Sequence, residues 1–175
     1  MNLTDKQIII AKAMVAGALA ALTNIAIARS CEPLKFSATL TFDQRLTVAA
    51  KSSVVVAIFL LVSIGRLAKH RFFTPEDIDS AASSHSTNRA KLLQAVLQNT
   101  LEQTVLAVIT YFVWAIIMPA DALGAIIGAA TLFAIGRVLF IHGYEKGAES
   151  RAIGFTLTFY PPAFMLIALA LRSVF

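Results

Sequence analysis

Polar and ionisable residues gather at three places in a chain that is otherwise strongly apolar. They are Arg66 with Lys69 and Arg71, Asn99 with Glu102, and Arg137 with Tyr144 and Arg151. Several basic groups and one acid suit a small anionic ligand that also carries an amino group, because guanidinium groups bind carboxylates and a carboxylate binds an ammonium. Such a site requires that the three groups meet in the folded protein.

The spacing of these residues suits helices that present them on shared faces. Asn99 and Glu102 are three residues apart, which puts both side chains on one side of a helix. Arg137, Tyr144 and Arg151 follow one another at intervals of seven and lie along one stripe of a continuous helix, with about 20° of drift per step. Neither face meets lipid at low cost, because an unpaired ionisable group at membrane depth costs on the order of a few kcal/mol.

The elements that must position these residues are membrane-spanning helices. Of the 175 residues, 58% are hydrophobic and 14% are charged, against about half and about a quarter in soluble proteins. Apolar stretches of about 20 residues fit a hydrocarbon core of about 30 Å. They are Ile8 to Ala28, Leu46 to Gly65, Leu101 to Met118, Ala122 to Ile141 and Ile153 to Leu171. Their continuous apolar character excludes the alternation of a β-barrel, so we predict an all-α membrane protein of four or five transmembrane helices.

The first span is interrupted by Lys12 and Asn24 and admits two interpretations. It is a transmembrane helix or a signal peptide, since the A-I-A sequence before Arg29 resembles a cleavage site. For five spans, eight Lys and Arg residues flank one side and four flank the other. The positive-inside rule then places the N-terminus and the loops 66–91 and 142–151 in the cytoplasm, and cleavage leaves the orientation of the other spans unchanged.

The composition argues against cysteine-based structural sites and against nucleic acid as a partner. The single cysteine, Cys31, excludes an internal disulfide framework and a clustered-cysteine metal site, and we expect no metal. The net charge of +5 could indicate nucleic acid, but the basic residues lie beside apolar spans, where they orient a membrane protein. We therefore expect a lipid bilayer as the partner of this chain and no nucleic acid.

Three local patterns predict further details of the fold. The segment Thr74 to Asp77 has the cap, first-turn proline and acidic residues of a short helix. Gly124 and Gly128 form G-x-x-x-G in an apolar span, which favours close approach of a neighbouring helix. Pro161 and Pro162 lie within the last span, where they remove two backbone donors and are expected to bend or loosen the helix.

The residues alone leave two interpretations of the polar groups open. In the first, Glu102 pairs with Arg137 or another basic residue to set the helix register, while Arg66 and its neighbours reach lipid phosphates. In the second, the same residues bind a polar ligand. A buried ion pair can serve either purpose, so the sequence pattern does not separate them.

Two sequence motifs resemble those of one membrane protein family. The segment R-V-L-F-I-H-G-Y-E-K-G-A-E-S-R, from Arg137 to Arg151, resembles the third-helix and loop motif of the MAPEG family, the membrane-associated proteins of eicosanoid and glutathione metabolism. The N-T-L-E segment from Asn99 to Glu102 is similar to the N-x-x-E motif of the family's second helix. The resemblance covers residues 46–175 as a four-helix transmembrane unit and leaves residues 1–45 as an N-terminal hydrophobic helix and connector.

The resemblance implies a homotrimer with active sites between neighbouring subunits near the cytoplasmic face. Glutathione would be the co-substrate, and small lipophilic electrophiles would be conjugated or reduced. Arg151 matches the arginine that activates the glutathione thiol, since a nearby guanidinium favours the nucleophilic thiolate. The residues implied to bind glutathione are Asn99, Glu102, Arg137 and Tyr144, with Arg66 matching more loosely. A bacterial-type member would lie in the inner membrane with its site facing the cytoplasm.

Two positions depart from the family pattern. Ala95 stands four residues before Asn99, where the family usually has an arginine that binds a glutathione carboxylate. Phe140 stands where the family has a tyrosine, four residues before Tyr144. The loss of one charge-assisted contact weakens binding by about 1.5 to 3 kcal/mol. The alternative function is therefore a non-enzymatic membrane protein of the same fold that binds lipid or another ligand.

Overall fold

In a computed structural model, the chain is an assembly of long helices. The structure describes residues 3–30, 39–78 and 86–174, and these contain helices and no strand. The helices are α1 (Asp5–Ser30), α2 (Phe42–Phe73), α3 (Pro75–Ile78), α4 (Asn88–Ile117), α5 (Gly124–Gly143) and α6 (Ala148–Val174), with short 3-10 turns at Ala120–Ala122 and Tyr144–Lys146. Five of the described helices, all but α3, are long and apolar enough to cross a membrane. The prediction of an all-α membrane protein with an additional N-terminal helix is confirmed.

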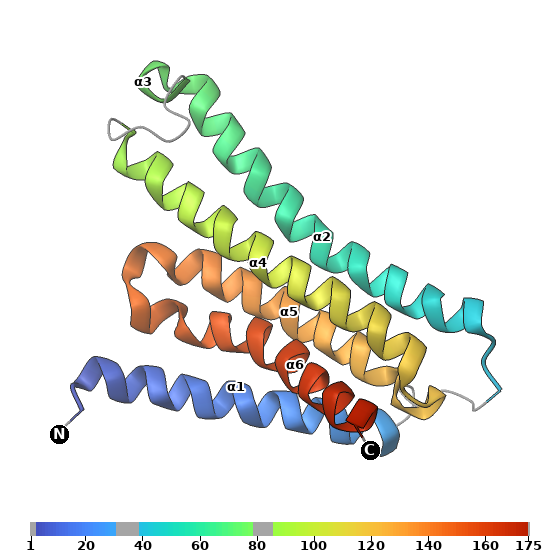
Figure 1. Ribbon diagram of the computed structural model, residues 1–175. Helices are drawn as coiled ribbons and strands as arrows, with labels where there is room; N and C mark the ends of the chain where they lie inside the picture. Colours follow the sequence, from blue (N-terminus) through green and yellow to red (C-terminus); the bar gives the residue numbers. More distant parts are fainter. Residues whose placement is uncertain (1–2, 31–38, 79–85, 175) are drawn as a thin grey trace.

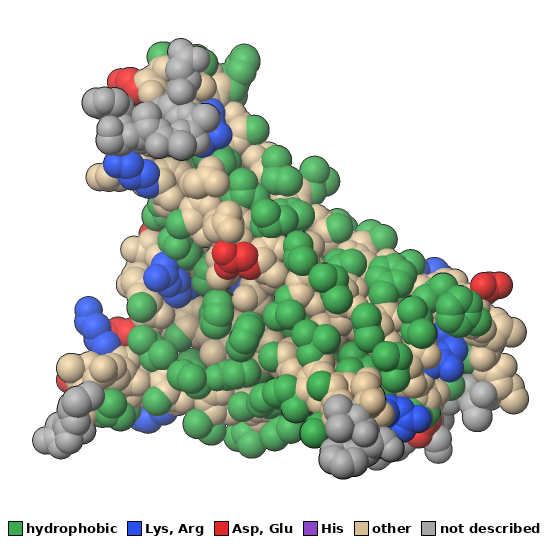
Figure 2. All heavy atoms as spheres, viewed as in Figure 1, with side chains coloured by type: hydrophobic (Ala, Val, Ile, Leu, Met, Phe, Trp, Pro, Cys, Tyr) green, Lys and Arg blue, Asp and Glu red, His purple; other side chains and the backbone are tan. Residues whose placement is uncertain are grey.

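The long helices lie side by side, with α2 and α1 on opposite sides of the bundle (Figure 1). The most extensive contacts join α5 to α6, α2 to α4, and α1 to α6. The core is built mainly from α4 and α5 with contributions from α2 and α6, and its largest members include the buried Trp114 and Phe133. The Trp114 indole donates a hydrogen bond of 2.9 Å to the carbonyl of Ala122, which ties the end of α4 to the turn before α5. Large apolar side chains cover much of the outer surface (Figure 2), as lipid contact requires.

Polar contacts hold the ends of the helices. Thr41 and Gln44 form a capping box at the start of α2. Arg45, one residue further along α2, donates to the carbonyls of Ala115 and Met118 at the end of α4. The start of α2 is therefore fixed against the end of α4, and the two helices run antiparallel.

The predicted short helix after α2 is confirmed as α3. Asp77 is fully buried there and accepts hydrogen bonds of 2.9 Å from the backbone N–H of Thr87 and 2.6 Å from its hydroxyl. Its carboxylate also lies 2.9 Å from Nε2 of His70 on α2. Asp77 therefore joins α2 to the N-terminal end of α4.

Helix α1 is held against α5 and α6 by small and polar residues. The hydroxyl of Thr156 on α6 donates 3.0 Å to the carbonyl of Ala13, and a Cβ at Gly17 would lie 2.5 Å from the Cβ of Thr156. Asn24 is buried and donates 3.0 Å to the carbonyl of Ala125 on α5. A Cβ at Gly128 would lie 1.7 Å from Oδ1 of Asn24, so this glycine of the G-x-x-x-G motif accommodates α1.

Glycines also bring α5 and α6 into backbone contact. A Cβ at Gly154 would lie 2.4 Å from the backbone nitrogen of Phe140, and one at Gly136 would lie 2.8 Å from the carbonyl of Gly154. α6 continues through Pro161 and Pro162 as one helix. The close approach places the first half of α6 directly beside the polar residues of α5.

Candidate functional site

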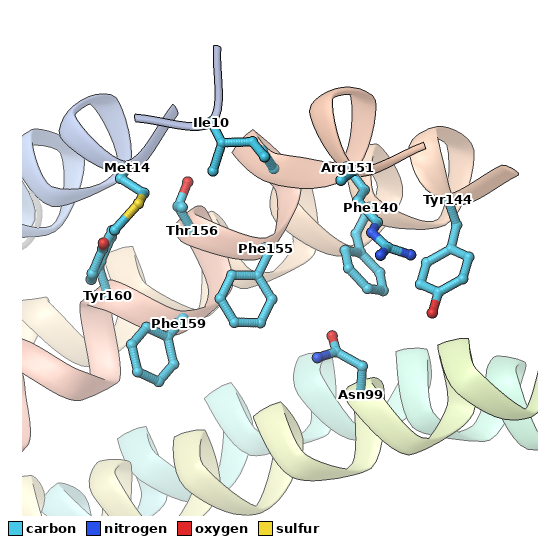
Figure 3. Close-up of a pocket in the computed structure, with 12 residues that line it drawn as sticks. Ile10, Met14, Asn99, Phe140, Tyr144, Arg151, Phe155, Thr156, Phe159 and Tyr160 are labelled. Carbon is cyan, nitrogen blue, oxygen red and sulfur yellow. The ribbon is translucent and has the colours of Figure 1, made fainter. Parts of the chain in front are cut away.

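A cavity of about 460 Å³ lies along one face of α6. Figure 3 shows α1 along one side of this cavity and α4 along the other. Its polar lining consists of Asn99, Tyr144, Arg151, Thr156 and Tyr160. The remaining lining is apolar or aromatic, so the cavity has a charged end at the start of α6 and an apolar body further along the helix.

The charged end is formed by Arg151 and Tyr144. The Arg151 guanidinium carbon lies 4.3 Å from the centroid of the Tyr144 ring, a distance at which a cation is attracted to the ring face. Gly147 has a φ of 106°, a left-handed conformation that glycine adopts readily and that turns the chain between the two residues. A Cβ at Gly143 would lie 2.3 Å from the carbonyl of Ser150, so only glycine allows the two helix ends to meet here. The turn thereby holds a guanidinium at the cavity wall.

Arg137 lies behind the cavity wall and does not line the cavity. It is fully buried, and its guanidinium donates hydrogen bonds of 3.0 Å to Oδ1 of Asn99, 3.4 Å to Thr100 and 2.6 Å to Thr158. The guanidinium carbon also lies 4.4 Å from the ring centroid of Phe140. No ion pair involves Arg137 in the part of the chain that the structure describes. A buried cation is therefore held by neutral oxygens and aromatic rings, an arrangement with a desolvation cost that no carboxylate offsets.

Arg137 sets the orientation of Asn99. Because the guanidinium can only donate, the amide oxygen of Asn99 must face Arg137, and its NH₂ group is directed away from that contact. Figure 3 shows the Asn99 amide directed from α4 toward the rings at the other side of the cavity. A residue that does not line the cavity thus aligns one that does.

Glu102 and Arg66 lie apart from the cavity. Glu102 is exposed on α4 and accepts a hydrogen bond of 2.9 Å from Gln98, so it does not pair with Arg137 in this structure. Arg66 is half-buried and lines a second cavity of about 490 Å³ together with Lys69, His70 and Arg89. Of the six site residues suggested by the sequence, the fold brings Asn99, Tyr144 and Arg151 together, places Arg137 behind them, and leaves Glu102 and Arg66 on other surfaces.

The two departures from the family pattern occupy different environments. Phe140 is buried, lies beneath the Arg137 guanidinium and contacts the Tyr144 ring edge-on at 5.2 Å between centroids. Ala95 is half-buried on α4, one turn before Asn99. Phe140 therefore forms part of the wall that separates Arg137 from the cavity, whereas position 95 can take a longer side chain near Asn99.

Several lining residues were not singled out from the sequence. On α6 they are Phe155, Phe159 and Tyr160, and on α1 they are Ile10 and Met14. The spacing of four between Phe155 and Phe159 indicates a shared helical face, but such a face is equally typical of lipid contact. No pattern in α1 indicates which residues face a ligand.

The MAPEG family model matches residues 46–171, from the second turn of α2 to near the end of α6. No curated protein and no solved structure matches the chain. The matched segment contains α2 through α6 with Asn99, Tyr144 and Arg151, and α1 precedes it. Since the match covers well over half of the chain, the protein belongs to the MAPEG family, the fold of which is a bundle of membrane-spanning helices.

Proposed function

We propose that this protein binds glutathione at the charged end of the cavity and conjugates it to lipophilic electrophiles that arrive from the bilayer. The observation that carries the proposal is the Arg151 guanidinium, held over the Tyr144 ring at one end of an otherwise apolar cavity. Such a site brings a charged nucleophile and an apolar acceptor into contact, although the two partition into different phases. Membership of the MAPEG family, which includes glutathione transferases, supports the assignment.

The chemistry assigned to Arg151 is stabilisation of a thiolate. The guanidinium lowers the free energy of the thiolate relative to the thiol, and the thiol proton passes to water. With an α,β-unsaturated aldehyde, the sulfur forms a bond to the β-carbon and the double-bond electrons move to give an enolate. The enolate then takes a proton from water, so the sum of the steps is the addition of one thiol across one double bond.

Recognition of the rest of glutathione is assigned to three further groups. The NH₂ of Asn99 donates to a peptide carbonyl or carboxylate of the ligand, Glu102 receives the ammonium group, and Arg66 binds a carboxylate. Since Glu102 and Arg66 do not line the cavity of their own chain, this assignment requires that a neighbouring subunit supplies them. A homotrimer in an inner membrane, with its sites at the cytoplasmic face, meets this requirement.

The second cavity supports a different candidate function. Arg66 and Lys69 bring two cationic side chains to one opening, beside His70 and Phe73, and Arg89 at the same opening pairs with Glu145. Basic groups next to exposed aromatic rings at a helix end suit an anionic lipid head group. In this alternative the protein is non-enzymatic, and the polar residues bind lipid.

Glutathione binding is the direct test of the proposed function. We expect purified protein in detergent to bind glutathione and to show the ultraviolet absorption of a thiolate at neutral pH. S-methylglutathione, which has no thiol, should bind without that signal and serves as the control. The proposal fails if calorimetry detects no binding at millimolar glutathione.

A gain of affinity is expected for Ala95→Arg. A guanidinium at position 95, one turn before Asn99, restores a contact to a glutathione carboxylate worth about 1.5 to 3 kcal/mol, which is about tenfold or more in affinity. The measurement is the glutathione dissociation constant by titration calorimetry, with Ala95→Met as a control of similar length and no charge. Equal affinities of the two variants would contradict the placement of a carboxylate near Asn99.

A further inference from the structure

Helix α1 forms a wall of the cavity although it lies outside the segment that matches the MAPEG family. The matched segment begins at residue 46, whereas Ile10 and Met14, one turn apart on α1, line the cavity. Figure 3 shows both side chains at the α1 edge, next to Thr156 and Tyr160 of α6. The cavity of this protein therefore contains side chains from outside the segment that matches the family.

The position of α1 beside the cavity is fixed by directional contacts. Ala13 accepts the hydrogen bond of Thr156, Gly17 packs on the same threonine, and Asn24 donates to α5. Ala13, Gly17 and Asn24 are four and seven residues apart along the chain, so these three anchoring residues lie on one face of α1. Ile10 and Met14 flank the first anchor and are thereby held at the rim of the cavity.

The cavity floor along α6 is a row of aromatic rings. Phe155 and Phe159 stack with centroids 5.6 Å apart and ring planes 17° apart, and Tyr160 follows at 5.6 Å from Phe159. From Arg151 to Phe159 the helix rises by eight residues, about 12 Å. Aromatic rings and a methionine thioether favour a flat, unsaturated ligand body, and Arg151 marks the end at which its reactive carbon must lie.

We propose that α1 is a specificity-determining wall that selects elongated, unsaturated electrophiles, with a body of about 12 Å that lies along α6. The electrophilic carbon then lies beside Arg151, and the apolar tail lies between Met14 and the aromatic rings of α6. This inference rests on the proposed conjugation for its reactive end. The binding of the apolar body to the cavity is independent of glutathione and can be tested without it.

A bulky residue at position 14 should act selectively on long substrates. We expect Met14→Trp to raise the KM for 2,4-decadienal about tenfold by filling the cavity beside α6. The KM for acrolein, which has no tail, and the dissociation constant of glutathione should not change. The matched control is Val15→Trp, because the neighbouring Val15 is 60% exposed and does not line the cavity. Equal changes for the two aldehydes, or equal effects of the two variants, would overturn the proposal.

Photolabelling separates this inference from the proposed function. A diazirine analogue of decadienal, applied without glutathione, should label Met14 and Phe159, and excess unlabelled decadienal should protect these residues. Label on the lipid-facing Val15 and Leu19 should not be protected. If glutathione does not bind but unlabelled decadienal still protects Met14 and Phe159 from labelling, the role of α1 in substrate binding is supported and the conjugation proposal fails. If no residue of α1 is protected, or phospholipid vesicles protect as well as the aldehyde, the wall is ordinary lipid contact and the inference fails.

Discussion

Arg151→Ala is expected to abolish the thiolate absorption of bound glutathione and to lower the conjugation rate by about 10²- to 10³-fold. The guanidinium is the cation of the cavity lining and lies over the Tyr144 ring. Removing a single preorganised group that stabilises a developing or resident anion has an effect of this size. The measurements are the ultraviolet difference spectrum on glutathione binding and kcat in detergent. The acidic limb of the pH profile, along which activity rises as the thiol loses its proton, should move to higher pH, because the thiol then ionises without the guanidinium.

Two controls separate chemistry from structure at this position. Arg151→Lys keeps the charge but loses the planar fork, and it should retain part of the thiolate signal. Size-exclusion chromatography with light scattering should show the same assembly for the wild type and the alanine variant. An alanine variant that forms thiolate normally would remove Arg151 from the mechanism, and one that dissociates would assign it a structural role.

Arg137→Met is expected to stabilise the protein and to weaken glutathione binding at least tenfold. The guanidinium is fully buried, and its hydrogen-bond acceptors in the described part of the chain are neutral oxygens. Replacing a buried ion pair with apolar side chains of similar volume is often neutral or stabilises by about 1 to 4 kcal/mol, and we expect an effect in the same direction for a buried charge that lacks a carboxylate partner. The substitution leaves the hydroxyl groups of Thr100 and Thr158 with hydrogen-bond acceptors, since both also donate to carbonyls of their own helices. Binding weakens because Asn99 loses the partner that orients its amide.

Thermal unfolding and calorimetry test the two halves of this prediction. Unfolding can be followed through Trp114, the single tryptophan of the chain. Glutathione affinity should fall, whereas the thiolate fraction of whatever glutathione binds should stay at the wild-type level, as a positioning role requires. The matched variant Thr158→Val removes the hydroxyl oxygen that accepts the 2.6 Å hydrogen bond from Arg137. It should destabilise the protein, because one N–H group of the buried guanidinium is then left without an acceptor. An unstable Arg137→Met protein with unchanged glutathione affinity would contradict the positioning role.

The location of the helices follows from the sequence, as the outcome for α2, α4, α5 and α6 demonstrates. Helices α2 and α6 contain the corresponding predicted spans, whereas α4 ends one residue before the end of its predicted span and α5 begins two residues after the start of its own. Helix α2 has 32 residues and continues past its predicted span to carry Arg66 and Lys69. The hydrophobic windows mark the part in hydrocarbon, whereas caps such as Thr41 and Thr87 decide where the helices begin.

The rotation of each helix about its own axis does not follow from such windows. Glu102 and Arg137 are both ionisable residues of apolar spans, yet Glu102 is exposed and Arg137 is fully buried. A span that is apolar on all sides has no preferred inward face. The faces are chosen by close contacts, such as those of Gly136 and Gly154 between α5 and α6, and these depend on two segments at once.

The sequence by itself therefore determined the class of the protein, the number of candidate spans and the segments that hold its reactive groups. Hydrocarbon thickness sets span length, and the spacing within Asn99–Glu102 and Arg137–Arg151 is a local property of the chain. Only the tertiary structure decided that Arg151 lines a cavity, that Arg137 supports Asn99 from behind, and that α1 is one wall of the site. These facts depend on which helices touch and at which rotation, and that is set by packing between residues far apart in the sequence.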